Sequence, residues 1–207
     1  MGTNGWLVLL DNGHGRETPG KASPDGALQE WEWTRAMAVR VGLELARAGI
    51  ASERLVPEAE DVPLAVRAAR ANRAAREAAG RGMRAVLVSL HCNASGDGKT
   101  WMAARGWQVH AARRASAQTH RLAGCLAEAM PGEFVTVRMP KAGQPWWEND
   151  FYILAHTECP AVLTENLFMD NRDDCRMLLT EEWQGRLARA HAAGVARYIA
   201  GDDPAKG

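Results

Sequence analysis

Residues 85–93 read Ala-Val-Leu-Val-Ser-Leu-His-Cys-Asn, and they set the architecture that we expect. The first six form an almost continuous apolar run, which is typical of a central parallel strand covered on both faces. The run leads directly to His91, so this strand would bring an imidazole to its carboxyl end. In open α/β sheets the functional groups gather beyond the carboxyl ends of the strands. The stretch therefore predicts a sheet between two layers of helices and the edge that carries a site.

Short apolar runs alternate with helical patterns on the N-terminal side of this strand. Residues 6–10 predict a first strand, and residues 31–48 predict a helix. A second helix is expected to run to Gly80, with Asp61 as its N-cap and Pro63 near its first turn. The apolar residues of the first helix recur at every fourth position, at Trp33, Met37, Val41 and Leu45.

The C-terminal half continues the alternation. Residues 131–150 are rich in proline and glycine and predict a long surface loop around at most one short strand. We therefore expect a single α/β domain over residues 1–200, with a twisted, mixed and largely parallel β-sheet flanked by helices on both faces, and a flexible tail at 201–207. Further strands are expected at 107–111, 151–154 and 161–164, and further helices at 115–130 and 181–199.

Composition excludes several classes of function. The 207 residues carry 25 Lys+Arg against 25 Asp+Glu, so no net charge attracts nucleic acid. Arg67, Arg70, Arg73 and Arg76 follow a helical stride and predict a solvated face, not a nucleic-acid site. The apolar run 6–10 is too short for a signal peptide or a transmembrane segment, which predicts synthesis in the cytoplasm. The 4 cysteines form no CxxC pair and are expected to be reduced thiols.

Three polar strings follow predicted strands directly, and two of them contain a histidine, His14 and His91. A catalytic zinc takes about three protein ligands and leaves one position for water or substrate. Glu30 is the third candidate, because it lies at the start of the first helix and can reach back to the strand end; Glu32 is its local competitor. Cys92 alternates away from His91 and is expected to be a small buried apolar residue.

Glu165 follows the strand expected at 161–164 and would be a carboxylate that is not a ligand. Such a group takes a proton from water at the metal and passes it to a leaving amine. The combination of His14, Glu30 and His91 as ligands with Glu165 as acid and base predicts amide hydrolysis. A His/His/Glu set also accepts other first-row metals.

At this point the chain resembles the zinc-dependent N-acetylmuramoyl-L-alanine amidases of the amidase type 3 group, over roughly residues 7–199. The family's Asp-Pro-Gly-His-Gly motif matches residues 11–15, with Asn12 in place of proline. Its Leu-x-Glu segment matches residues 28–30, and its Ser-x-His-x-Asn motif matches residues 89–93. Its catalytic Glu-Asn/Gly-x-Phe string matches residues 165–168.

The resemblance implies a single-zinc hydrolase with His14, Glu30 and His91 as ligands and Glu165 as the catalytic group. The bond it implies joins N-acetylmuramic acid to L-alanine in peptidoglycan. Because no signal peptide or wall-binding repeat is visible, the chain is most similar to a phage lysin or a prophage-derived relative. It would then act on the cell wall after release by a holin.

Some assignments stay open. Asn93 would either steer a ligand or contact substrate, or close the turn that follows it. Trp146 and Trp147 would form an apolar wall for the sugar or peptide, or cap a core. Glu148 would face the basic or amidated end of a peptide, or lie in solvent. The alternatives to an amidase are a zinc peptidase that cuts within the wall peptide and a non-catalytic peptidoglycan-binding module.

Overall fold

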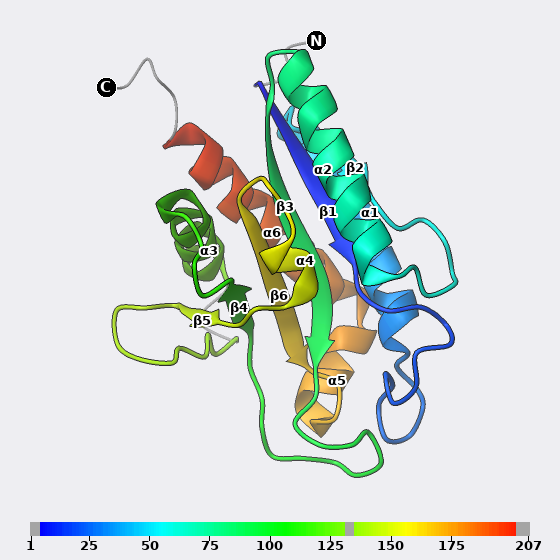
Figure 1. The fold of residues 1–207 in the computed structure, drawn as a ribbon. Coiled ribbons are helices and arrows are strands. Elements are labelled where there is room, and N and C mark those ends of the chain that lie inside the picture. The colour runs from blue at the N-terminus through cyan, green and yellow to red at the C-terminus, as the bar shows by residue number, and fades with distance from the viewer. Residues whose placement is uncertain (1–4, 131–134, 202–207) are drawn as a thin grey trace.

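Across residues 5–130 and 135–201, the computed structural model shows six strands in one sheet, in the order β2-β1-β3-β6-β4-β5 (Figure 1). The first four positions are parallel to one another, β4 runs antiparallel to β6, and β5 is parallel to β4. The mixed, largely parallel sheet is therefore confirmed. The strands are β1 (Trp6–Asn12), β2 (Ala51–Arg54), β3 (Arg84–Asn93), β4 (Gln108–Ala111), β5 (Trp146–Glu148) and β6 (Ala161–Phe168).

Helices cover both faces of the sheet, as expected (Figure 1). One face packs against α1, α3, α5 and α6, and the other against α2 and the short α4. All four predicted apolar positions of α1 lie in the first of these cores. The helices are α1 (Glu30–Arg47), α2 (Leu64–Gly80), α3 (Ala117–Ala129), α4 (Tyr152–Ala155), α5 (Arg172–Leu179) and α6 (Glu181–Ala200).

Strand β3 is buried on both faces, which explains its unbroken apolar run. Val86, Val88 and Cys92 join the core under α1 and α6, whereas Leu87 joins the core under α2. His91 belongs by alternation to the α2 face, at the carboxyl end of the strand. Cys92 is buried on the opposite face, as predicted, and the four cysteines are free thiols.

The predicted N-cap of α2 is wrong. The helix begins at Leu64 with Pro63 in the cap position and no side-chain cap hydrogen bond. The residue before a proline is disfavoured in the helical region, so the helix cannot start at Val62. Asp61 is therefore outside the helix, and its carboxylate accepts hydrogen bonds from Arg67 and Thr18 instead.

The strand expected at 151–154 is also wrong, because residues 152–155 form α4. Ile153 and Leu154 are both buried, although they are adjacent in the chain. A strand would point adjacent side chains to opposite faces, whereas one helical turn turns both towards the core under α2. Phe151 and Tyr152 are left 38% exposed.

Two elements carried no prediction, the edge strand β2 and the short helix α5. Strand β2 reads Ala-Ser-Glu-Arg and is mostly exposed, so it has no apolar pattern to detect. Residues 131–134 of the predicted loop and 202–207 of the predicted tail lie outside the described residues. No helix in the part of the chain that the structure describes has the length and apolar character needed to span a bilayer.

Candidate metal centre and active site

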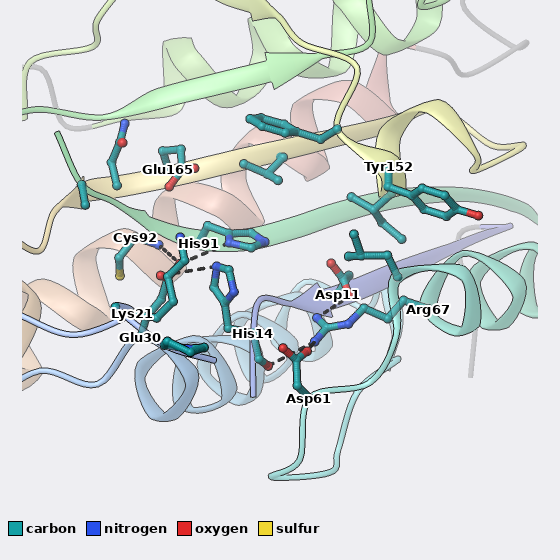
Figure 2. Close-up of a pocket in the computed structure, with 18 of the residues that line it drawn as sticks. Asp11, His14, Lys21, Glu30, Asp61, Arg67, His91, Cys92, Tyr152 and Glu165 are labelled. Carbon is teal, nitrogen blue, oxygen red and sulfur yellow. Dashed lines mark hydrogen bonds and ion pairs between the residues drawn. The ribbon is translucent and has the colours of Figure 1, made fainter. Parts of the chain in front are cut away.

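The candidate site lies where the carboxyl ends of β1, β3 and β6 meet on the α2 face of the sheet. His91 of β3 is the register partner of Glu165 on β6. His14 is the second residue after β1, and Glu30 is the first residue of α1. Figure 2 shows the side chains of His14, Glu30 and His91 converging, with Glu165 on the neighbouring strand.

One carboxylate joins the two imidazoles. Glu30 Oε1 lies 3.2 Å from His91 Nδ1, and Glu30 Oε2 lies 3.5 Å from His14 Nε2. The backbone N–H of Cys92 donates to Glu30 Oε1 at 2.9 Å, which ties the carboxylate to β3. The two rings are nearly perpendicular, with centroids 4.9 Å apart.

The arrangement fits a divalent metal. One ligand atom from each of His14, Glu30 and His91 lies within 4.8 Å of the other two. Glu30 Oε2 is buried and, among the described residues, accepts no hydrogen bond, so it retains a free electron pair for a cation. The structure thus brings together all three predicted ligands, and it does so with Glu30 and not with Glu32, which is exposed.

The electrostatics keep His14 and Glu30 in the forms that bind a metal, whereas at His91 a proton competes with the metal. Burial lowers the pKa of His14 to about 4, so its imidazole stays neutral and keeps a lone pair at neutral pH. Burial opposes the charged form of His91, but its hydrogen bond to Glu30 and the Glu30 charge raise its pKa. Burial likewise works against ionised Glu30, yet the hydrogen bond and charge of His91 lower the pKa of its carboxyl.

Glu165 differs from Glu30 in its surroundings. Burial raises its pKa to about 7, which outweighs the opposing effect of the His91 charge. Within the described chain its Oε2 atom is buried and without a hydrogen-bond partner. A carboxyl group with this pKa exchanges a proton near neutral pH, which suits a general acid and base.

Asn93 lines the same cleft as His91, which agrees with the predicted facing. Its side-chain amide donates to Gln108 Oε1 at 2.7 Å, and Gln108 is the register partner of Glu165 on β4. Sequence patterns did not indicate Gln108, because its position beside Asn93 and Glu165 depends on the pairing of β4 with β6.

The structure places Trp146, Trp147 and Glu148 away from the cleft, on the edge strand β5. The Trp146 ring stacks on His120 with centroids 4.7 Å apart, and Trp147 Nε1 donates to the Arg138 carbonyl at 2.9 Å. None of the three is among the residues that line the cleft, and their contact with substrate stays a prediction.

The cleft has a volume of about 900 Å³ and two chemically different ends. Figure 2 shows Tyr152 and Arg67 on one side of the two histidines and Lys21 on the other. The first side, the aromatic end, carries the charged residues Asp11, Asp61 and Arg67 as well as Val62, Pro63, Leu64, Phe151, Tyr152 and Ile153. The second is lined by Pro19, Gly20, Lys21, Asn93, Ala94, Gly96 and Asp97.

Two arginines that sequence patterns did not assign to the site lie directly beneath it. Arg67 is 2% exposed, so its prediction as part of a solvated face is wrong. Its guanidinium is satisfied inside the molecule by Asp61, by Asp11 and by backbone carbonyls. Arg35 of α1 reaches the same backbone. A stride of three on a helix does not reveal which of its arginines has partners in a distant loop.

Residues 8–197 match the family described as N-acetylmuramoyl-L-alanine amidase, Amidase_3. The chain belongs to this amidase family. The endolysin of Bacillus phage SPP1 is 28% identical to it, over 93% of this chain and 66% of that protein. The amidase AmiC of Neisseria meningitidis serogroup B is 27% identical, over 93% of this chain and 52% of that protein. The chain thus spans between about half and just under two thirds of these two relatives.

Solved structures show the same fold as this member of the amidase family. The N-acetylmuramoyl-L-alanine amidase of Clostridium difficile 630 has a TM-score of 0.82 at 24% identity, covering 98% of this chain and all of its own. The catalytic domain of CwlV from Bacillus (Paenibacillus) polymyxa var. colistinus has a TM-score of 0.77 at 23% identity, covering 94% of this chain and 98% of its own. At these identities the likeness extends to the fold alone.

Proposed function

We propose that this amidase-family chain is a zinc-dependent N-acetylmuramoyl-L-alanine amidase. It hydrolyses the amide between the lactyl group of N-acetylmuramic acid and L-alanine in peptidoglycan. The observation that carries the proposal is the convergence of His14, Glu30 and His91 opposite Glu165 in one cleft. The amidase and endolysin relatives support the substrate class and action on the cell wall. We expect release by a holin, as for a phage lysin.

His14, Glu30 and His91 would hold the zinc, which supplies Lewis acidity towards an amide carbonyl when bound. Glu30 contributes the negative charge of the ligand set, and its bond from Cys92 N–H holds it in place. The neutral His14 needs no deprotonation to act as a ligand at neutral pH.

Glu165 would move the protons. As a carboxylate it accepts a proton from the attacking water, and as a carboxylic acid it returns that proton to the departing amine of L-alanine. A pKa of about 7 makes both forms accessible near neutral pH. Since the amine is a poor leaving group until it is protonated, the second transfer is as necessary as the first.

The two ends of the cleft would take the two halves of the substrate. The aromatic end, with half-exposed Phe151 and Tyr152, would present its rings to the sugar. The polar end contains Lys21. Its positive charge acts to lower the pKa of Glu165, Glu30 and His14. The peptide of peptidoglycan carries carboxylates, and Lys21 would face one of them.

A peptidase that cuts within the wall peptide would use the same four residues. Digestion of purified peptidoglycan by the zinc-loaded protein separates the two activities. We expect new amino-terminal alanine, which Glu165→Gln loses by about 10²-fold or more while it still binds zinc. Other new amino termini would indicate a peptidase. No product, together with retained binding to peptidoglycan, would indicate a non-catalytic binding module.

A further inference from the structure

Three successive backbone carbonyls before and at His14 point towards buried side chains. The Asn12 carbonyl accepts a hydrogen bond from Arg67 at 2.6 Å. The Gly13 carbonyl accepts two, from Thr34 Oγ1 at 3.0 Å and from Arg35 at 3.4 Å. The His14 carbonyl accepts two, from Arg35 at 3.0 Å and from Arg67 at 3.1 Å. A guanidinium from α1 and one from α2 therefore meet at a single carbonyl.

The backbone that they hold is unusual. His14 has a φ of 59°, in the left-handed region that non-glycine residues rarely adopt. This conformation costs roughly 1–2 kcal/mol for a residue with a Cβ, so the surrounding structure must maintain it. In this conformation the His14 ring lies beside Glu30 and His91.

Bringing two guanidiniums together is itself costly. Burial lowers the pKa of Arg35, and the charge of Arg67 lowers it further. Asp11 and Asp61 lie 3.4 Å and 3.0 Å from Arg67 and offset part of that repulsion. A pair of like charges that carries this cost and ends on one carbonyl is not a generic way to fill a core.

We propose that Arg35 and Arg67 are positioning residues that hold His14 in its left-handed conformation, so that the site is formed before the metal arrives. The inference rests on the proposed role of His14 as a zinc ligand. Neither arginine is one of the proposed metal ligands. Each acts only through the backbone of residues 12–14.

The test replaces each arginine by lysine, which keeps the charge but cannot bond two carbonyls with a planar fork. Arg67→Lys removes the larger set of bonds, and Arg35→Lys gives a second variant if the first does not fold. Arg70→Lys is the matched control, because Arg70 lies one turn further along α2 and bonds to Glu58 and the Leu55 carbonyl instead. The zinc Kd is measured by competition with a chromophoric chelator, and the melting temperature of each metal-free protein is recorded.

We expect the zinc Kd to rise by about 10- to 100-fold in Arg67→Lys and Arg35→Lys, the range typical of residues that orient a ligand. Arg70→Lys should stay within about twofold of wild type. A purely structural role would lower the melting temperature of the metal-free variants and leave the zinc Kd unchanged, which overturns the inference alone. Failure of the wild-type chain to bind zinc overturns both the inference and the proposed metal site.

Discussion

At the scale of single residues, Gly13 is a position where the site has no room for a side chain. A Cβ at this position would lie 2.2 Å from Cε1 and 2.4 Å from Nδ1 of His91. The ring of His91 lies against the bare backbone of the loop that carries His14. Glycine is therefore required here by close approach and not by an unusual φ.

We predict that Gly13→Ala displaces the His91 ring and weakens zinc binding by at least about tenfold, because a ligand leaves its position. Overpacking should also lower the free energy of unfolding by about 1–3 kcal/mol. Chelator competition and urea unfolding measure the two effects. Gly80→Ala is the control, since nothing lies within 4 Å of a Cβ there. Normal zinc affinity in Gly13→Ala would contradict the prediction.

Glu165 also has a consequence for stability. Burial raises its pKa from 4.5 to about 7, so folding favours the protonated form. That contribution is fully present below pH 4.5 and is lost as the pH rises through 7. We predict that Glu165→Gln, which cannot ionise, gains stability over wild type between pH 5 and pH 8, by roughly 1–3 kcal/mol. Urea unfolding of metal-free protein at both pH values checks this, and an equal difference at both would refute it.

At the scale of elements, α3 and α6 approach each other closely at Gly194. A Cβ there would lie 2.8 Å from Leu126 Cα and 3.0 Å from the Cys125 carbonyl oxygen. Backbone atoms cannot move aside as a flexible side chain does, so the helices would have to separate. Gly124, on the same helix pair, has nothing within 4 Å of a Cβ.

We predict opposite effects for one substitution at these two glycines. Gly194→Ala should lower the free energy of unfolding by about 1–3 kcal/mol, because steric cost outweighs the better helix propensity. Gly124→Ala should raise it by up to about 1 kcal/mol, because only propensity acts. Urea denaturation of both variants gives the comparison. Stabilisation by Gly194→Ala would show that the helices pack less closely than described.

At the scale of the whole molecule, the cleft lies between segments from both halves of the chain. Residues 19–21 line its polar end, and α4 lines its aromatic end. The scissile amide would lie between them, at the metal centre. Under the proposed function, the sugar would lie over Phe151 and Tyr152 and the peptide would extend towards Lys21.

We predict that Lys21→Met lowers kcat/KM roughly tenfold for substrates with a peptide carboxylate and little for carboxamide analogues, mainly through KM. Muramoyl dipeptides ending in D-glutamate or D-isoglutamine, and tripeptides ending in diaminopimelate or lysine, identify which carboxylate is bound. Lys99→Met is the control, because Lys99 does not line the cleft. An equal fall in kcat for charged and amidated substrates would instead place Lys21 in the chemical step.

Local patterns were sufficient for much of the fold and for the four residues of the candidate centre. The apolar run of β3 and the four-residue spacing in α1 reflect burial directly, because the apolar side chains of both elements lie in a core. His14 follows β1, and His91 and Glu165 lie in the C-terminal halves of β3 and β6. Parallel strands bring their carboxyl ends to one edge of the sheet. The prediction of Glu30 as a ligand required only that the first helix begin beside that edge of the sheet.

Contacts between distant segments decided the rest. Residues 151–154 suit a strand or a helical turn equally well, and packing on α2 selected the turn. Arg67 has the spacing of a solvated arginine, but it is buried and donates hydrogen bonds to carbonyls more than fifty positions earlier in the chain. Trp146 and Trp147 lie away from the cleft because their strand, β5, pairs with β4 at the far edge of the sheet. Hydrophobic periodicity reports which face of an element is buried, whereas the partner of a polar group depends on which segments the completed fold brings together.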